Sequence, residues 1–175
     1  MQIEKVNPER FDEIYALMEV SFPADERRTY SGQKALLERP AYGIYASTAP
    51  ETGRIQAIAA VWELEGLTFL EHLAVNPSDR NGGIGAAFLT ALVARAGKPV
   101  CLEVEKPGNE LAARRIRFYQ RNGFFLNEYD YVQPALAEGQ KPVPLLVMTS
   151  GGPVTKPEFE RIKGLLYEKV YETPV

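Results

Sequence analysis

The segment with the clearest chemical meaning is Arg80-Asn81-Gly82-Gly83-Ile84-Gly85, which lies between a strand-like run and a helix-like run. Glycines at such a turn let the backbone approach a ligand closely, and the first N–H groups of a helix have no partner within it. With the positive end of the helix dipole, these donors favour phosphate groups. Arg80 adds a cation beside them. The segment is therefore predicted to hold a phosphate or pyrophosphate group.

Three phosphate-containing ligands compete for this glycine segment: a nucleoside triphosphate, a dinucleotide and coenzyme A. A P-loop requires Lys-Ser or Lys-Thr after its glycines, and neither pair follows here. The dinucleotide fingerprint fits at Gly83 and Gly85, and Glu103 lies about 20 residues on, where a ribose-binding acid is expected. However, Phe88 takes the place of the third glycine, and residues 76–82 lengthen the turn. A nucleotide-dependent oxidoreductase is therefore disfavoured.

The elements that would position this segment follow from hydrophobic periodicity and turn residues. After a short first strand, helices are predicted over 7–20, 32–39, 84–96, 110–122 and 156–171. Strands are predicted over 42–47, 54–64, 67–75, 99–105, 129–135 and 142–150. Strands beside crossover helices imply an α/β sheet with at least one parallel pair, 67–75 beside 99–105.

Two motifs within this order of elements resemble those of the GNAT superfamily of acyl-CoA-dependent N-acetyltransferases. The run L-x-V-N-P-x-x-R-N-G-G-I-G contains the family signature R/Q-x-x-G-x-G/A at Arg80, Gly83 and Gly85. The run RFYQRNGF at 117–124 resembles the family's tyrosine block at the expected distance after the 99–105 strand. Either motif alone is weak, but both in this order are specific.

The resemblance is strongest over residues 54–126 and implies a single GNAT-like domain over 1–175. The implied fold is a mixed, mostly antiparallel sheet flanked by helices, with a central parallel strand pair splayed around the cofactor. The implied reaction is transfer of an acetyl group from acetyl-CoA to a primary amine of a small molecule, peptide or protein by direct attack. The alternative is a non-catalytic acyl-CoA-binding module of the same fold.

The resemblance also implies which residues hold acetyl-CoA. Backbone N–H groups of 81–86 would hold the pyrophosphate, and strand residues 73–75 would pair with the pantetheine arm as an added strand does. Relatives often carry a pantetheine-contacting Asn where this chain has Ala112, so Asn109 is the candidate replacement. The implied cofactor-binding residues are Leu73, Ala74, Val75, Arg80, Asn81, Gly82, Gly83, Ile84, Gly85, Ala86 and Asn109.

Tyr119 and Glu71 are the implied catalytic residues, and a main-chain N–H near Leu73 would polarise the thioester carbonyl. Tyr119 would assist the departing thiolate by hydrogen bonding rather than by full proton transfer. The reason is that the ordinary pKa of a tyrosine, about 10, exceeds that of a thiol, about 8.5. The alternative is that Tyr119 is a core residue. Glu71 would take the proton of the amine or bind it, or else is a polar residue at a sheet rim.

Strand alternation places Glu71 on the face of Leu73 and Val75, with His72 on the opposite face. Apolar neighbours on that face would raise the pKa of Glu71, unless it acts through water. His72 is predicted to be a structural histidine.

Further candidates surround these residues. Glu103 and Glu105 are weaker candidates for the base. Glu26 or Arg27 would read the charge of the acceptor, or belong to a solvated loop. Two late aromatic residues, Tyr129 and Tyr131, would line the cleft or pack as strand formers.

The composition of the 175 residues excludes several other classes of protein. With 20 Lys+Arg, 23 Asp+Glu and a net charge of -3, broad nucleic-acid binding is not expected. One cysteine, Cys101, and one histidine allow neither an internal disulfide nor a structural zinc site, so no metal is expected. No membrane span or signal peptide is predicted. The expected protein is cytoplasmic, and its late strands and terminal helix would suit a homodimer.

Overall fold

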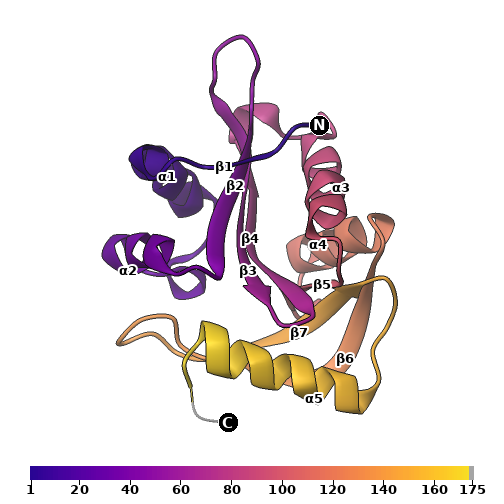
Figure 1. The fold of residues 1–175 in the computed structure, drawn as a ribbon. Helices are drawn as coiled ribbons and strands as arrows, with labels where there is room; N and C mark the ends of the chain where they lie inside the picture. The colour runs from indigo at the N-terminus through magenta and orange to yellow at the C-terminus, as the bar shows by residue number, and fades with distance from the viewer. Residues whose placement is uncertain (174–175) are drawn as a thin grey trace.

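The computed structural model describes residues 1–173, which form a twisted sheet with helices on both faces (Figure 1). The helices are α1 (Phe11–Ser21), α2 (Tyr30–Ala35), α3 (Ile84–Ala96), α4 (Glu110–Arg121) and α5 (Lys156–Leu165). The strands are β1 (Glu4–Lys5), β2 (Tyr42–Thr48), β3 (Ile55–Leu64), β4 (Leu67–Val75), β5 (Val100–Glu105), β6 (Phe124–Gln133) and β7 (Val143–Ser150). Their order in the sheet is β1-β2-β3-β4-β5-β7-β6.

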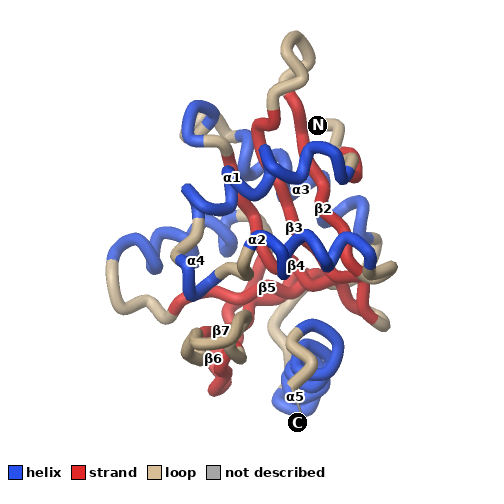
Figure 2. Tube along the Cα trace, turned by 90° about the vertical axis from the view of Figure 1, so that its left-hand side faces the viewer, coloured by secondary structure: helices blue, strands red, loops and turns tan. Residues whose placement is uncertain are grey.

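Each face of the sheet has its own apolar core. The first core joins the sheet to α1, α5 and the 3₁₀ turn after α2 (Leu36–Glu38) through buried residues that include Phe11, Phe69 and Phe159. The second joins the opposite face to α3 and α4 through residues that include Phe88 and Ile116. Figure 2 shows α1 and α2 in front of the strands, while α3 and α4 lie behind them. The sheet therefore separates two layers of helices.

The parallel pair predicted from the sequence is present but short. Strands β4 and β5 pair only from Thr68–Leu70 to Val100–Leu102. Beyond Leu70, β4 remains paired with β3, and beyond Leu102, β5 remains paired with β7. The two strands thus diverge at their carboxyl ends, and the sheet opens at its centre.

Several predicted boundaries differ from the structure. The first helix begins as a 3₁₀ turn, Pro8–Arg10, before α1, and the last ends in a π-helical turn, Leu166–Val170. Strand β6 begins at Phe124, five residues before the predicted 129–135 segment. Its register against β7 shifts between Asn127 and Tyr131, which breaks the alternation that marks a strand in a sequence. Among residues 1–173, no helix is both long and apolar enough to cross a membrane.

Candidate active site

A cavity of about 980 Å³ lies where β4 and β5 diverge, and residues from both faces of the sheet line it. We name its two parts by the helices beside them. The α3/α4 half is lined by residues that include Arg80, Gly83, Ile84, Gly85, Phe118 and Tyr119. The α1/α2 half is lined by residues that include Phe22, Glu26, Glu71, His72, Glu103 and Tyr171. The cavity therefore joins two chemically different surfaces through the sheet.

The amino end of α3 forms one wall of the α3/α4 half. Gly83 precedes the helix with a φ of 79°, in the left-handed region that favours glycine. The N–H of Ala87 donates to the carbonyl of Gly83 over 3.1 Å, which closes the first helical turn. The N–H groups of residues 84–86 precede that bond and have no partner within the helix. This arrangement suits an anionic group, as the sequence predicted.

Gly85 brings the helix close to the neighbouring elements. A Cβ at this position would lie 3.3 Å from Cγ2 of Val75 and 3.6 Å from Cζ of Phe118. Only the distance to Val75 is tighter than an ordinary contact, so a side chain there would require Val75 to shift slightly, and the glycine permits the close packing of α3 against β4.

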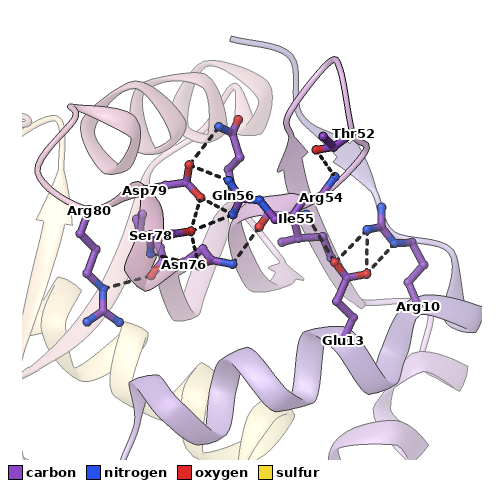
Figure 3. A network of polar contacts seen from close by, with 11 residues as sticks. Arg10, Glu13, Thr52, Arg54, Ile55, Gln56, Asn76, Ser78, Asp79 and Arg80 are labelled. Carbon is purple, nitrogen blue, oxygen red and sulfur yellow. Dashed lines mark hydrogen bonds and ion pairs between the residues drawn. The ribbon is translucent and has the colours of Figure 1, made fainter.

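The turn before the glycines is attached to the start of β3 (Figure 3). Asp79 forms an ion pair with Arg54, with 2.6 Å between Oδ2 and Nη1, and accepts a hydrogen bond from Gln56. Asn76 donates to the carbonyl of Ile55 over 3.3 Å. Arg80 lies outside this network and donates from Nε to the carbonyl of Val75 over 3.2 Å. The loop is thereby held in place while the exposed Arg80 side chain borders the cavity.

The edge of β4 beside the cavity carries backbone groups that β5 does not pair. The N–H of Asn76 donates to Gln56 of β3, so alternation directs the N–H groups of Leu73 and Val75 toward the opening. Leu73, Ala74 and Val75 all line the cavity. An extended ligand could therefore hydrogen-bond to this edge.

Tyr119 lies in the α3/α4 half, where its ring contacts those of Phe118 and Phe124. Its hydroxyl has no hydrogen-bond partner among residues 1–173. Burial raises the pKa of Tyr119 to about 12, although the nearby Arg115 lowers it. The hydroxyl is thus a hydrogen-bond donor and a poor acid, and Tyr119 both packs and lines the cavity.

The alternation expected around Glu71 is wrong because β4 has a bulge there. Residues Ala60 and Val61 of β3 pair with His72 and Leu70, which leaves Glu71 as the extra residue. Leu73 packs into the second core, whereas Glu71 and His72 both face the α1/α2 side. Glu71 therefore shares a face with His72 and not with Leu73 and Val75.

Glu71 is fixed by a buried ion pair with Arg28. Its Oε1 lies 2.5 Å from Nη1 of Arg28, and the two side chains are 3% and 9% exposed. Burial raises the pKa of Glu71, but Arg28 and His72 outweigh that effect and bring the pKa to about 2. The expectation of a raised pKa is thus wrong: Glu71 is ionised at neutral pH and is a weak base.

His72 is buried, as predicted for a structural histidine. Its Nε2 lies 2.8 Å from the carbonyl oxygen of Glu26, and its ring packs edge-on against Phe22. Its Nδ1 lies 3.6 Å from Oε2 of Glu71, and neither of these two buried atoms has a hydrogen-bond partner in the described chain. The histidine therefore connects β4 to the segment between α1 and α2.

Glu103 stands on β5 in the same half and accepts hydrogen bonds from two tyrosines. The hydroxyl of Tyr131 lies 2.5 Å from Oε1, and that of Tyr171 lies 2.7 Å from Oε1 and 2.8 Å from Oε2. Burial raises the pKa of Glu103 to about 7 despite these donors. The π-helical turn after α5 ends beside Tyr171 and so delivers it to the cavity.

Glu26 and Glu105 line the same half of the cavity, and their carboxyl groups are neighbours. Burial and this second carboxyl raise the pKa of Glu26 to about 7, while Arg115 and His72 lower it. Glu105 also lies 3.4 Å from Nη1 of Arg115.

The remaining predicted residues lie elsewhere. Asn109 caps α4, where its Oδ1 accepts from the N–H of Ala112 over 2.9 Å, and it does not line the cavity. Gly82 belongs to the loop but not to the lining, and Tyr129 bonds to the carbonyl of Val154. Cys101 is buried in β5, and burial raises the pKa of its thiol far above the ordinary range.

Sequence reasoning missed Gln133 and Tyr171, which line the cavity, and Arg28, which forms the ion pair with Glu71. Gln133 is 5% exposed, and its Nε2 has no partner in the described chain. The charged run at 25–28 was the only signal near Arg28, and nothing in it identified Glu71 as the partner. Among residues 1–173, no group of three His, Cys, Asp or Glu side chains is placed to bind a metal ion.

Comparisons with known proteins agree with this architecture. The sequence matches the GNAT acetyltransferase family over residues 11–124. A GNAT-family protein from Bacteroides thetaiotaomicron is 30% identical, covers 99% of this chain and 100% of its own, and superposes with a TM-score of 0.88. A search of curated proteins finds no match.

More distant structures share the fold alone. A spermidine N-acetyltransferase from Vibrio cholerae is 10% identical, with 86% of this chain and 94% of its own covered and a TM-score of 0.65. The ribosomal-protein-S18-alanine N-acetyltransferase from Escherichia coli is 18% identical, with 88% and 95% covered and a TM-score of 0.63. The chain belongs to the GNAT family of acetyltransferases, and its fold is the mixed α/β sheet of that family.

Proposed function

We propose that this protein is an N-acetyltransferase that transfers an acetyl group from acetyl-CoA to a primary amine by direct attack. The proposal rests on one observation: a continuous cavity joins the two faces of the sheet where β4 and β5 diverge. The start of α3, whose free N–H groups suit an anion, lies in its α3/α4 half, and carboxyl groups gather in its α1/α2 half. A two-substrate reaction needs such a pair of connected, chemically different sites.

The α3/α4 half suits the acyl donor. The free N–H groups at the start of α3, with Arg80 beside them, would hold the pyrophosphate of acetyl-CoA. The open edge of β4 would pair with the amide groups of the pantetheine arm, and the N–H of Leu73 points where it could stabilise the oxyanion. Tyr119 would donate a hydrogen bond to the departing thiolate. No covalent enzyme intermediate is needed, which agrees with the inert position of Cys101.

The α1/α2 half suits an amine. Four carboxyl groups, from Glu26, Glu71, Glu103 and Glu105, line it, and two nearby guanidinium groups, from Arg28 and Arg115, partly neutralise them. An acceptor that arrives as an ammonium ion would meet a favourable field there. The acceptor is therefore proposed to be a primary amine of a small molecule, peptide or protein.

Thermal-shift measurements with acetyl-CoA, NAD and ATP, followed by a thiol-release assay across a panel of amines, test this function. Acetyl-CoA at about 100 times its dissociation constant should add about 2.7 kcal/mol of stability. A shift with NAD and none with acetyl-CoA would contradict the donor assignment. Binding of acetyl-CoA without thiol release for any amine would instead favour a non-catalytic acyl-CoA-binding module.

A further inference from the structure

Direct attack requires a neutral amine, so some group must take a proton from the acceptor's ammonium. Two of the carboxyls in the α1/α2 half are poorly placed for this. Glu71 is tied to Arg28 through Oε1 at 2.5 Å and is too weak a base, with a pKa of about 2. Glu103 already accepts tyrosine hydroxyls on both carboxyl oxygens. Glu26 and Glu105 remain.

Glu26 lies between α1 and α2 in a segment held by contacts with two other parts of the chain, β4 and the loop before β7. Its own carbonyl lies 2.8 Å from Nε2 of His72 on β4. Nε2 of Gln140 donates to the carbonyls of Ala24 and Arg27 over 2.8 and 3.0 Å. The neighbouring Arg28 is anchored on Glu71. These contacts fix the backbone, while the Glu26 carboxyl lines the cavity and, within residues 1–173, forms no ion pair.

We propose that Glu26, which lies beside Glu105 in the α1/α2 half of the cavity, is the catalytic base that takes the proton from the acceptor's ammonium. This inference rests on the proposed N-acetyltransferase function and assigns its proton acceptor. The bulge at Glu71 supports it, because it turns the carboxylate of β4 into a partner of Arg28, whereas Glu26 lines the cavity without an ion pair in the described chain.

The surroundings of Glu26 suit this task. The charged or titratable groups that face it are Glu105 from β5, Arg115 from α4 and His72 from β4. Burial and Glu105 together raise its pKa to about 7, although Arg115 and His72 act in the opposite direction. A base works best when its pKa lies near the working pH, since it is then both available and strong enough.

The proton balance is complete without a further reactant. The ammonium gives one proton to Glu26, and the neutral nitrogen then attacks the thioester carbonyl carbon. The C–N bond forms, the C–S bond breaks, and the electron pair of the C–S bond leaves on sulfur. The second proton that the nitrogen loses ends on that sulfur as the thiol, and Glu26 releases its proton to water.

The test is the pH dependence of kcat/KM for thiol release by the wild type and by Glu26→Gln, Glu105→Gln and Asp25→Asn. The wild type should gain activity with an inflection near pH 7. Glu26→Gln should lose that inflection and about 100-fold of the rate at neutral pH. The loss should shrink as the pH nears the acceptor's own pKa, about 10 for a lysine-like amine.

Glu105→Gln should keep the inflection but move it to lower pH, because Glu26 then lacks its acidic neighbour and still faces Arg115. The matched control, Asp25→Asn, removes an exposed carboxylate from the adjacent position, outside the cavity, and should behave as the wild type. Melting temperatures establish that each variant is folded. If Glu26→Gln does not fold, the test is the pH of the inflection in Glu105→Gln, which should be lower than in the wild type. An inflection at the same pH as in the wild type overturns the inference.

The outcomes distinguish a failure of the Glu26 assignment from a failure of the proposed N-acetyltransferase function. Thiol release by the wild type with an unchanged profile for Glu26→Gln overturns this inference and leaves the N-acetyltransferase function standing. An equal loss in Asp25→Asn also overturns it, because the effect then belongs to the loop. Absence of thiol release by the wild type with every amine overturns both.

Discussion

Tyr119 combines two roles that a sequence motif cannot separate. Its ring packs between Phe118 and Phe124, and its hydroxyl lines the cavity without a partner in the described chain. Because burial raises its pKa to about 12, the hydroxyl keeps its proton at neutral pH and can donate a hydrogen bond to a thiolate. This supports hydrogen-bond stabilisation rather than full proton transfer.

The variant Tyr119→Phe keeps the packing and removes the donor. A hydrogen bond to a charged group contributes about 1.5–3 kcal/mol, so kcat should fall by roughly 10- to 100-fold while the affinity for acetyl-CoA stays the same. Steady-state kinetics with a calorimetric Kd measure both quantities. Tyr129→Phe, whose hydroxyl bonds to Val154 outside the cavity, is the control and should retain kcat. An unchanged kcat in Tyr119→Phe would remove the residue from the mechanism.

The Arg28–Glu71 pair makes a separate prediction about stability. Removing one partner of a buried ion pair strands the other charge and costs about 3–5 kcal/mol. Arg28→Met should therefore destabilise the protein strongly, and Arg28→Met with Glu71→Gln should regain part of that loss. Denaturant unfolding of both single variants and the double variant measures the coupling. Strictly additive effects would mean that the two side chains do not depend on each other.

These residues show which parts of the candidate site could be predicted from the sequence alone. The glycine loop and Tyr119 were predictable because their motifs are local and sit beside recognisable elements. The Arg28–Glu71 pair was not, since 43 positions separate its members and a bulge decides which way Glu71 points. A period of two in the sequence cannot reveal a bulge, because one extra residue reverses the face of every side chain that follows.

Among the elements, the turn from β4 to α3 connects fold and function most directly. It was predicted as a long loop, and β4 and α3 have the predicted bounds, 67–75 and 84–96. The ion pair of Asp79 with Arg54, the residue just before β3, was not predictable, because it depends on how β3 and β4 are registered. The start of β6 was not predictable either, because the register shift between Asn127 and Tyr131 breaks the alternation of its side chains.

The variant Asp79→Ala tests whether this ion pair positions the glycine loop. Surface ion pairs contribute about 0–1 kcal/mol, so the Kd for acetyl-CoA should rise by at most about 5-fold. The rate at saturating acetyl-CoA should stay unchanged, since no catalytic group moves. Calorimetry and steady-state kinetics measure these two values. Glu51→Ala, in the exposed 49–54 turn, is the control, and a large fall in kcat in Asp79→Ala would contradict a purely positioning role.

For the whole molecule, the opening between β4 and β5 gathers buried carboxyls that affect its stability. Glu26 and Glu103 have pKa values raised from 4.5 to about 7, so between these values the folded protein binds more protons than the unfolded chain. Stability then falls as the pH rises through this window. Glu71 acts in the opposite direction, because its pKa is lowered from 4.5 to about 2 and its contribution is lost as the pH falls through that range.

The ligand-free protein should consequently melt at a higher temperature near pH 5 than near pH 8, and scanning calorimetry across this range measures the difference. Glu103→Gln replaces one of the responsible carboxyls by a neutral group that can still accept a hydrogen bond from a tyrosine hydroxyl. It should therefore reduce the difference between the two melting temperatures, mainly by raising the melting temperature at pH 8. Glu128→Gln, on the exposed side of β6, removes the same charge away from the cavity and should leave the difference intact. Equal slopes in the wild type and Glu103→Gln would mean that Glu103 is not protonated in the folded state. The acidic half of the cavity would then carry one more negative charge below pH 7, and its field would attract a cationic acceptor more strongly.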